Sequence, residues 1–358
     1  MNRGGMETFT MNMYRHIDRS VVQFDFLLHR GFKGDYDNEI KSLGGRIFYI
    51  RRQNPLDPFY WNDLNSFFSL HKYKVVHVQL DCLSAEPLAA AARHGVTVRV
   101  AHSHNSRQDR DLKYPLKMAC KPFIKKYATD LFACGIEAGK WMFGTDNFKV
   151  IKNAIDIDAY AYDPIVRSNI RVDLGISDNA FVVGHVGRFT HVKNHNFILR
   201  VFAQLYKEHP NSVLLLAGEG ETLDESKLLA GELGISESVY FLGVRSDIPC
   251  LMQTMDAFLM PSLYEGLPMV LVEAQASGLQ CLISDSIPED CDIEGRTVNR
   301  MSLEADPASW ASKLVSVARV PHDRALGATV VRSAGFDASE QAARLQEFYL
   351  QRAELADV

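Results

Sequence analysis

Short apolar segments alternate with helix-like segments along almost the whole chain, and this alternation constrains the fold more than any other feature. The candidate strands of the first half are residues 21–28, 46–50, 74–79, 96–101, 131–134 and 149–151. Those of the second half are residues 181–186, 213–217, 239–242, 257–260 and 281–284. Helical patterns lie between them, as at 196–208 and 268–277. The alternation predicts an α/β protein built on parallel sheets with helices on both faces.

The alternation pauses at about residues 152–178, where the sequence becomes irregular and polar. A chain of 358 residues is long enough for two domains. We therefore predict an N-terminal domain at 1–164 and a C-terminal domain at 165–335, each doubly wound and Rossmann-like, with ligand bound in a cleft between them. The amphipathic stretch 336–358 is expected to form a C-terminal helix that packs back towards the N-terminal domain.

Composition limits the environment and the partners of the chain. With 47% hydrophobic and 23% charged residues it is ordinary for a globular protein. Its six cysteines form no C-x-x-C pair, which favours a reduced, cytoplasmic protein. No apolar run approaches the ~20 residues of a membrane span, so membrane contact would be peripheral. The net charge of −5 and the lack of a recognition motif argue against nucleic acid as a partner.

Two carboxylates bracket the segment from Glu265 to Glu273, which contains the sequence Gly-Leu-Pro. This pattern is typical of a turn that runs into a helix, with proline in the first turn. The free N–H groups of such a helix point back at the turn and form an anion site. Glu265 would lie just before the helix and Glu273 about two turns inside it. A nucleotide sugar, with its sugar, diphosphate and ribose, matches this layout.

A second group of residues follows the candidate strand 181–186. Gly187 and Arg188 come directly after it, and Lys193 lies five residues beyond Arg188. A guanidinium and an ammonium at the carboxyl end of a strand suit a diphosphate. Taken alone they fit surface residues of a loop better, but the glutamate pair downstream reverses this and favours the diphosphate. Two further strand ends could bring backbone to a phosphate or a base, or could be ordinary turns; they carry Gly220 and Val244.

His102 and His104 end the candidate strand 96–101. No third metal ligand is evident nearby, so acid–base chemistry or phosphate contact is the simpler functional interpretation, and a structural role is the alternative. Three D-x-D spacings could hold a divalent cation, but chance explains them in a chain with 44 acidic residues, and no metal site is predicted. These spacings are Asp35/Asp37, Asp109/Asp111 and Asp156/Asp158.

Lysines recur at helical spacing through residues 113–126, with apolar residues between them. Such a basic amphipathic helix could rest on an anionic membrane surface. It could equally present a solvated charged face. A solvated face is the usual case, but the excess of Lys and Arg over Asp and Glu in the first 164 residues gives the membrane interpretation equal weight.

Together these motifs resemble the retaining glycosyltransferases of family 4, which have the GT-B fold, and among them the bacterial capsule and exopolysaccharide enzymes. The resemblance covers nearly the whole chain. It rests on an N-terminal glycine loop, a segment ahead of the linker and the donor-site motifs, namely Gly4-Gly5-Met6-Glu7, Ala133-Cys134-Gly135, Trp141-Met142-Phe143-Gly144, Ile151-Lys152-Asn153-Ala154-Ile155-Asp156, Gly187-Arg188 with Lys193, and Glu265 with Glu273.

The resemblance implies a role for each matching residue. Arg188 and Lys193 would bind the donor diphosphate and stabilise the departing nucleotide, while Glu273 would hold the ribose hydroxyls. Glu265 would contact the donor sugar and the β-phosphate together with backbone groups. With the residues that the strand ends suggested, the expected backbone contacts to the donor are Gly187, Gly220, Val244, Gly266 and Leu267.

In the first domain the resemblance assigns the active-site histidine to His102, with His104 as the second choice. Gly4 and Gly5 would lie near the phosphates or the acceptor. The predicted catalytic residues are thus His102, Arg188, Lys193 and Glu265. In the family a strand precedes the glycine loop, whereas here only Met1 and Asn2 do. We expect the first sheet to lack this N-terminal strand and the chain to be destabilised without it.

The implied reaction moves a sugar from a nucleotide-sugar donor to a saccharide or polyprenyl-linked acceptor, with the acceptor in the first domain and the donor in the second. A UDP-sugar is the expected donor and a GDP-sugar the second possibility; no cofactor or metal is required. The cysteine usage and the basic segment 113–126 lead us to expect a cytoplasmic enzyme with peripheral contact at the inner face of the membrane. The alternatives are a sugar-nucleotide epimerase or hydrolase of the same fold, and a non-catalytic nucleotide-sugar binding protein.

Overall fold

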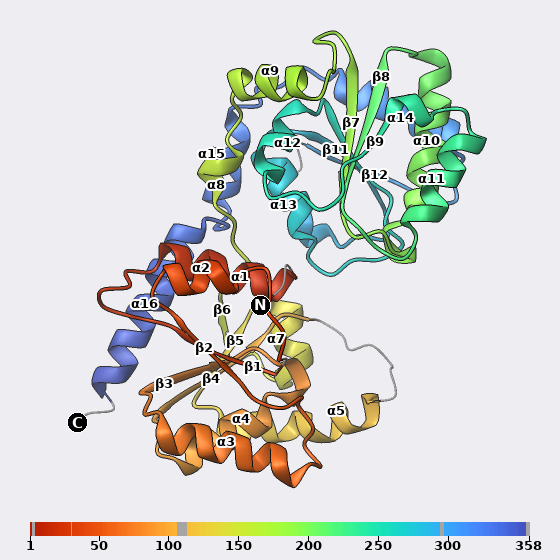
Figure 1. Cartoon of the computed structure of the whole chain (residues 1–358). Helices are drawn as coiled ribbons and strands as arrows, with labels where there is room; N and C mark the ends of the chain where they lie inside the picture. The colour runs from red at the N-terminus through yellow and green to blue at the C-terminus, as the bar shows by residue number, and fades with distance from the viewer. Residues whose placement is uncertain (2–3, 30, 106–112, 294–296, 356–358) are drawn as a thin grey trace. The chain divides into compact units, whose positions relative to one another are not determined.

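The structure is a computed structural model that describes residues 1, 4–29, 31–105, 113–293 and 297–355. The chain forms two compact units (Figure 1). Unit 1 consists of Met1–Ala154 and Asp337–Val358, and unit 2 of Ile155–Phe336.

In its described residues, unit 1 contains six strands and the helices that connect them. In chain order the elements are α1 (Gly5–His16), β1 (Asp25–Leu28), α2 (Asp37–Ser42), β2 (Arg46–Tyr49), α3 (Pro58–Leu70), β3 (Val75–Val78), η1 (Asp81–Leu83), α4 (Ala85–Arg93), β4 (Val98–Ser103), α5 (Tyr114–Cys120), η2 (Lys121–Phe123), α6 (Ile124–Tyr127), β5 (Asp130–Ala133), α7 (Ile136–Phe143), β6 (Lys149–Val150) and α16 (Ala338–Leu355).

The strands of unit 1 form two separate parallel sheets, β1-β2 and β3-β4-β5-β6. One face of the larger sheet packs against α1 and α16, around Phe132 and Leu345. Its other face packs against α4 and α7, around Leu88 and Met142. The helix α16 lies directly against α1, so the end of the chain completes the core of the first unit.

Unit 2 contains a second set of strands and helices. In chain order these are α8 (Ile157–Tyr160), α9 (Pro164–Asp173), β7 (Phe181–Val186), η3 (His191–Lys193), α10 (His195–Glu208), β8 (Ser212–Ala217), α11 (Leu223–Glu232), η4 (Ser236–Ser238), β9 (Val239–Phe241), α12 (Ile248–Thr254), β10 (Ala257–Met260), α13 (Met269–Ala276), β11 (Gln280–Ser284), η5 (Glu289–Cys291), β12 (Val298–Met301), α14 (Pro307–Ala318) and α15 (Leu326–Ser333).

These strands form one parallel sheet in the order β12-β11-β10-β7-β8-β9. Helices cover both faces: α12 and α13 lie on one side, and α10, α11 and α14 on the other (Figure 1). Every residue of β10 and β11 is buried, as expected for strands with helices on both faces. The architecture is α/β, with two Rossmann-like units as the sequence predicted.

Three of the helices begin with the same local signal, an aspartate followed by proline. Asp57, Asp163 and Asp306 each cap the first turn by accepting backbone N–H hydrogen bonds, and each is followed by proline at the first helical position. The carboxylate satisfies N–H groups that have no partner inside the helix, and proline has no N–H to satisfy. These local signals determine where α3, α9 and α14 begin.

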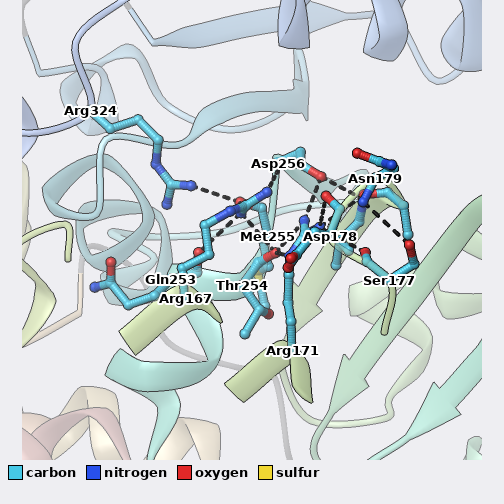
Figure 2. Close-up of polar contacts among 12 residues, drawn as sticks. Arg167, Arg171, Ser177, Asp178, Asn179, Gln253, Thr254, Met255, Asp256 and Arg324 are labelled. Atoms are coloured by element: carbon cyan, nitrogen blue, oxygen red, sulfur yellow. Dashed lines mark hydrogen bonds and ion pairs between the residues drawn. The ribbon is translucent and has the colours of Figure 1, made fainter. Parts of the chain in front are cut away.

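A buried arginine fastens α9 to the sheet of unit 2 (Figure 2). Arg171 is 1% exposed, and its guanidinium donates to the backbone oxygens of Thr254 and Ala180 and to the carboxylate of Asp256, the last at 2.9 Å. Arg167 binds the same carboxylate at 2.6 Å. The planar guanidinium thus donates to backbone carbonyls of two segments and to a carboxylate at the same time.

The structure differs from the sequence expectations at several places. The first unit ends at Ala154 rather than at 164, because α8 packs on α12, α13 and α15 of the second unit. The predicted helix 113–126 is divided into α5, η2 and α6, with Pro122 inside the 3-10 turn. The edge strand β12 was missed, because Asn299 and Arg300 make its sequence polar. The pair Asp109/Asp111 lies outside the described residues.

Candidate functional site

The sheet of unit 2 has a topological switch point between β7 and β10. From β7 the chain continues to β8 and β9 on one side and then crosses to β10, β11 and β12 on the other. The connections after these two neighbouring strands therefore leave in opposite directions. In open parallel sheets ligands bind outside the carboxyl ends of the strands at such a point.

An ion pair joins the two loops at this switch point. Lys193, at the end of η3, lies in the loop after β7, and Glu265 lies in the loop after β10. The Nζ of Lys193 is 2.6 Å from Oε1 of Glu265, and the two side chains are 19% and 13% exposed. The N–H of Leu263 also donates to the oxygen of Val192 at 2.8 Å. The structure thus brings together two predicted site residues that are 72 positions apart in the sequence.

Arg188 lies in the same loop after β7 and is exposed. It makes no hydrogen bond or ion pair with the part of the chain that the structure describes. Its loop packs tightly against the loop after β8. A Cβ on Gly218 would lie 2.0 Å from the oxygen of Gly187, and one on Gly220 would lie 2.2 Å from the oxygen of Phe189. Only glycine permits this approach, which holds the guanidinium-bearing loop close to the strand ends.

Two buried histidines, which the sequence analysis did not single out, support the loop after β7. A Cβ on Gly187 would lie 2.9 Å from Nε2 of His185. The ring of His195 stacks on Phe189 with 3.8 Å between centroids. Burial, and then the charge of Lys193, lower the pKa of His195 to about 4; burial and neighbouring charges also hold the pKa of His185 well below its usual value. Both rings are neutral at pH 7, so they add no positive charge beside Arg188 and Lys193.

The helix α13 begins at Met269, one residue later than the sequence suggested, with Pro268 at the N-cap and no side chain capping its first turn. Gly266 is exposed and Leu267 partly buried in the loop ahead of it. The first N–H groups of the helix are thus not capped by a side chain. They face the loop that carries Glu265, which is the arrangement expected of an anion site.

Glu273 lies in the second turn of α13. Burial raises the pKa of its carboxyl group to about 7, and the Tyr160 hydroxyl, which hydrogen-bonds to it, partly opposes the increase. Tyr160 belongs to α8 and is 9% exposed. Sequence reasoning missed this tyrosine because it lies in the segment read as an irregular linker, and no local pattern marks it.

The two remaining donor-side predictions lie at the ends of neighbouring strands. Gly220 follows β8, and Val244 follows β9 and is 57% exposed. The N–H of Gly218 donates to the oxygen of Gly243 at 2.8 Å, which ties the two loops together. The loops after β7, β8, β9 and β10 therefore form one connected rim, defined here as residues 187–193, 218–221, 243–247 and 261–268.

In unit 1, His102 lies inside β4 rather than after it, because the strand continues to Ser103. It is 1% exposed. Its Nδ1 is 3.1 Å from Nε2 of His77, whose Nδ1 is 2.5 Å from the hydroxyl of Tyr349 on α16. Its Nε2 is buried and has no partner among the described residues. His77 and Tyr349 are additional members of this cluster that the sequence gave no reason to connect with His102.

His104 lies beside this cluster, with its ring 4.2 Å from that of His102. It contacts Asn153 and Gln79 at 3.1 and 3.0 Å. Burial lowers the pKa of His77 to about 3 and of His104 to about 4, and holds that of His102 well below its usual value. All three rings are therefore neutral at pH 7, and burial accounts for this before any neighbouring charge.

The glycine loop at the start of unit 1 leads directly into α1. Gly4 is the N-cap residue, and a Cβ on it would lie 2.5 Å from the carboxylate of Glu7. Gly5 begins the helix and faces open space. No side chain caps this helix, so the first N–H groups of α1 have no side-chain acceptor from the cap residue.

None of the His, Cys, Asp and Glu groups in the described ranges is arranged to hold a metal ion. Within those same ranges no helix is both long and apolar enough to cross a bilayer.

Comparison with known proteins shows the family. Residues 166–324 match the family described as "Glycosyl transferases group 1". The protein named EpsF in Bacillus subtilis (strain 168) is 39% identical over 362 residues, which are 98% of this chain and 94% of that protein. The capsular polysaccharide biosynthesis glycosyltransferase CapH of Staphylococcus aureus is 28% identical, and the match covers 88% of each chain.

Among solved structures, the crystal structure of Anabaena HepE in complex with UDP and glucose is similar in fold. Its TM-score is 0.77 at 20% identity, covering 96% of this chain and 95% of that one. The fold is accordingly GT-B, as the resemblance implied. This protein is a glycosyltransferase and belongs to the glycosyl transferases group 1 family.

Proposed function

We propose that this enzyme transfers a sugar from a UDP-sugar to a saccharide acceptor in the synthesis of a cell-surface polysaccharide, with retention of anomeric configuration. The observation that carries the donor assignment is the ion pair between Lys193 and Glu265 across the switch point of unit 2. The UDP bound to HepE supports uridine as the base, and the name of CapH supports the polysaccharide.

Each rim residue has a proposed role that follows from its chemistry. Arg188 offers a guanidinium with no partner among the described residues, and Lys193 has N–H donors beyond the one that meets Glu265. Both would neutralise the diphosphate as the sugar–phosphate bond breaks, when negative charge builds on the leaving group. The start of α13, at Gly266 and Leu267, would add backbone N–H donors to the same charge.

The carboxylates would position the donor rather than attack it. Glu265 would accept hydrogen bonds from sugar hydroxyls. Glu273 would accept them from the ribose, and its raised pKa means that hydroxyl donors or a rise in pH must favour the ionised form. Gly187, Gly220 and Val244 would complete the rim with backbone contacts to the phosphates and the base.

Retention follows from attack on the same face that the leaving group departs from, without a protein nucleophile. The acceptor hydroxyl would approach the anomeric carbon from the face that the diphosphate leaves. The departing phosphate oxygen would take the hydroxyl proton as the new glycosidic bond forms through an oxocarbenium-like state. Unit 1 is the proposed acceptor domain, with His102 as its active-site histidine, His104 as the second candidate, and Gly4 and Gly5 near the phosphates or acceptor. No metal or other cofactor is part of the proposal.

A cytoplasmic enzyme that meets its acceptor at the membrane is a further part of the proposal. Lys125 and Lys126 are exposed at α6, and the neighbouring Phe123 is 51% exposed. Cations beside an exposed aromatic ring suit the surface of anionic lipid. Sedimentation with anionic vesicles tests this: the Lys125→Glu/Lys126→Glu variant should stay in the supernatant, and equal pelleting of both proteins would refute it.

A transfer assay tests the reaction itself. The protein is incubated with UDP- and GDP-sugars, with and without oligosaccharide or polyprenyl-diphosphate-linked acceptors. Release of UDP that requires an acceptor, with a product whose anomeric configuration matches the donor by NMR, is the expected result. Release or interconversion of the donor without acceptor would instead identify a hydrolase or epimerase. Binding without turnover of any donor would indicate a non-catalytic protein.

A further inference from the structure

A cavity of unit 1 lies at the carboxyl ends of its parallel strands. Its volume is about 420 Å³, and its lining comes from the connections after β2, β3 and β4. Arg51, Arg52 and Gln53 contribute from the first connection, Leu83 from the second and Lys113 from the third. In parallel sheets, ligands bind outside the carboxyl ends of the strands. The cavity thus has the size and the place of a small-molecule site.

Hydrogen bonds connect this cavity to the loop that carries His104. The side-chain amide of Gln53 donates to the oxygen of Leu83 at 2.5 Å and joins the first two connections. Two residues before Leu83, the carboxylate of Asp81 accepts from the side-chain amide of Asn105 at 2.7 Å. Asn105 directly follows His104 in the chain. The cavity therefore belongs to the same edge of unit 1 as the histidines of the proposed acceptor site.

Three cations line this cavity, and carboxylates hold one of them in place. The guanidinium of Arg51 binds Asp63 through Nε and Nη2 at 2.7 and 3.2 Å, and its Nη1 is 3.9 Å from Asp57. Nη1 therefore keeps N–H donors for a ligand. Arg52 is exposed and makes no hydrogen bond or ion pair with the part of the chain that the structure describes. Lys113 is exposed as well, so the cavity offers positive charge to an anion.

Apolar side chains lie in and beside the same cavity. Pro55 and Leu116 are among its lining residues. Leu56, next to Pro55, is 76% exposed, and Phe59 in the first turn of α3 is 62% exposed. The guanidinium carbon of Arg51 lies 5.2 Å from the centroid of the Phe59 ring, which places this ring beside the cations. Exposed apolar side chains next to cations suit a ligand that is both anionic and apolar.

We propose that this cavity binds the diphosphate of a lipid-linked saccharide acceptor, and that the start of the lipid chain lies over Leu56 and Phe59. The diphosphate would accept hydrogen bonds from Arg51, Arg52 and Lys113, while the saccharide extends towards the histidines. The inference rests on the proposed sugar transfer and specifies its acceptor as an amphipathic diphosphate.

The combination of charge and apolar surface distinguishes this occupant from simpler ligands. A diphosphate carries several negative charges on neighbouring oxygens, and arginine binds such oxygens bidentately. An inorganic anion would use the cations but would leave Leu56 and Phe59 in water. An uncharged lipid would cover these two side chains but would leave Arg52 without an anion. Only a ligand with both parts satisfies both features of the cavity.

Calorimetric titration with farnesyl diphosphate, a soluble amphipathic diphosphate, tests the proposal without requiring turnover. The wild type is compared with a charge variant, Arg52→Ala/Lys113→Ala, and with an apolar variant, Leu56→Ser/Phe59→Ser. Lys72→Ala is the control, since Lys72 is exposed ahead of β3, at the amino end of that strand. All five side chains are exposed, so each variant should keep the unfolding midpoint of the wild type. UDP is titrated into each protein as well, because the proposed donor residues lie in the other unit.

The charge variant should weaken binding of both farnesyl diphosphate and inorganic diphosphate by ~10–100-fold. The apolar variant should weaken farnesyl diphosphate alone, by ~10-fold. The control should change neither, and UDP affinity should be the same in all proteins. Farnesyl diphosphate that does not bind the wild type, or that binds the charge variant equally well, would overturn the proposal. Equal wild-type affinity for inorganic diphosphate would identify a free-anion site, and equal affinity for farnesol a site for uncharged lipid; either would also overturn it. Absence of UDP binding alone would instead refute the donor assignment.

Discussion

At the scale of single residues, Glu273 is the group whose charge state matters most for the proposed donor site. Burial raises the pKa of its carboxyl group from 4.5 to about 7. The folded protein therefore binds this proton more tightly than the unfolded chain does. As pH rises from about 4.5 to 7, this group reduces the free energy of unfolding, by at most ~3 kcal/mol.

The Glu273→Gln variant tests this sign, because glutamine mimics the protonated acid. Its stability advantage over the wild type should grow as pH rises through this window and vanish below pH 4.5, as measured by denaturant unfolding. UDP binding by the wild type should strengthen above pH 7, where the carboxylate can accept from the ribose. A constant difference between the two proteins at all pH values would show that Glu273 does not titrate there.

The histidine cluster of unit 1 yields a second prediction at this scale. A hydroxyl of Tyr349 that donates to Nδ1 of His77 leaves Nε2 of His77 to donate to Nδ1 of His102. This order places the proton of His102 on Nε2. In the Tyr349→Phe variant the order is lost, and nitrogen NMR should show His102 as a mixture of tautomers. The same Nδ1 protonation in both proteins would contradict the assigned direction.

At the scale of elements, the approach of the loop after β8 to the loop after β7 is closer than any side chain allows. Gly218 has φ +143, and a Cβ there would meet the oxygen of Gly187 at 2.0 Å. Gly218→Ala should displace the loop that bears Arg188, destabilise unit 2 by about 1–3 kcal/mol and weaken UDP binding by ~10-fold or more.

The matched control for that variant is Gly231→Ala. Gly231 lies on the exposed side of α11, and its Cβ would make only an ordinary contact at 3.8 Å with Ser236. Alanine there should stabilise the helix by roughly 0.5–1 kcal/mol and leave UDP binding unchanged. Denaturant unfolding of both variants measures their stability, and calorimetric titration measures their UDP binding. Equal effects of the two substitutions would mean that the loop contact has no special role.

The arginine that fastens α9 to the sheet gives the second prediction for an element. The guanidinium of Arg171 reaches backbone oxygens of two segments and the carboxylate of Asp256 at the same time (Figure 2). Lysine keeps the charge but has no planar fork of donors. Arg171→Lys should therefore destabilise unit 2 by about 1–3 kcal/mol, because a buried carbonyl loses its donor. Full stability of this variant in denaturant unfolding would show that charge alone suffices.

At the scale of the whole molecule, the sequence predicted the fold better than it predicted the side-chain contacts. The strands 181–186 and 257–260 have the bounds expected from their apolar runs. Residues after such strands could be expected to meet, since parallel strands end at one edge of a sheet, and Lys193 does meet Glu265. These features could be predicted because hydrophobic periodicity and turn residues act over a few neighbouring positions.

Contacts between distant segments could not be predicted in the same way. Tyr160 meets Glu273, and Tyr349 meets His77, across 272 positions of sequence in the second case. Neither tyrosine lies in a motif, and each becomes buried only when its helix, α8 or α16, packs against the rest of its unit. The strand β12 was missed for a related reason, because its edge position tolerates polar residues that hide a strand pattern.

The central claim is that the rim of unit 2 binds the diphosphate of a nucleotide sugar through Arg188 and Lys193. Calorimetric titration of UDP into the wild type and into the Arg188→Ala and Lys193→Ala variants tests it most directly. Lys207→Ala is the control, since Lys207 is exposed on α10 away from the rim. We predict that each rim variant weakens UDP binding by ~10–100-fold and that the control does not. Unchanged affinity in both rim variants would contradict the account.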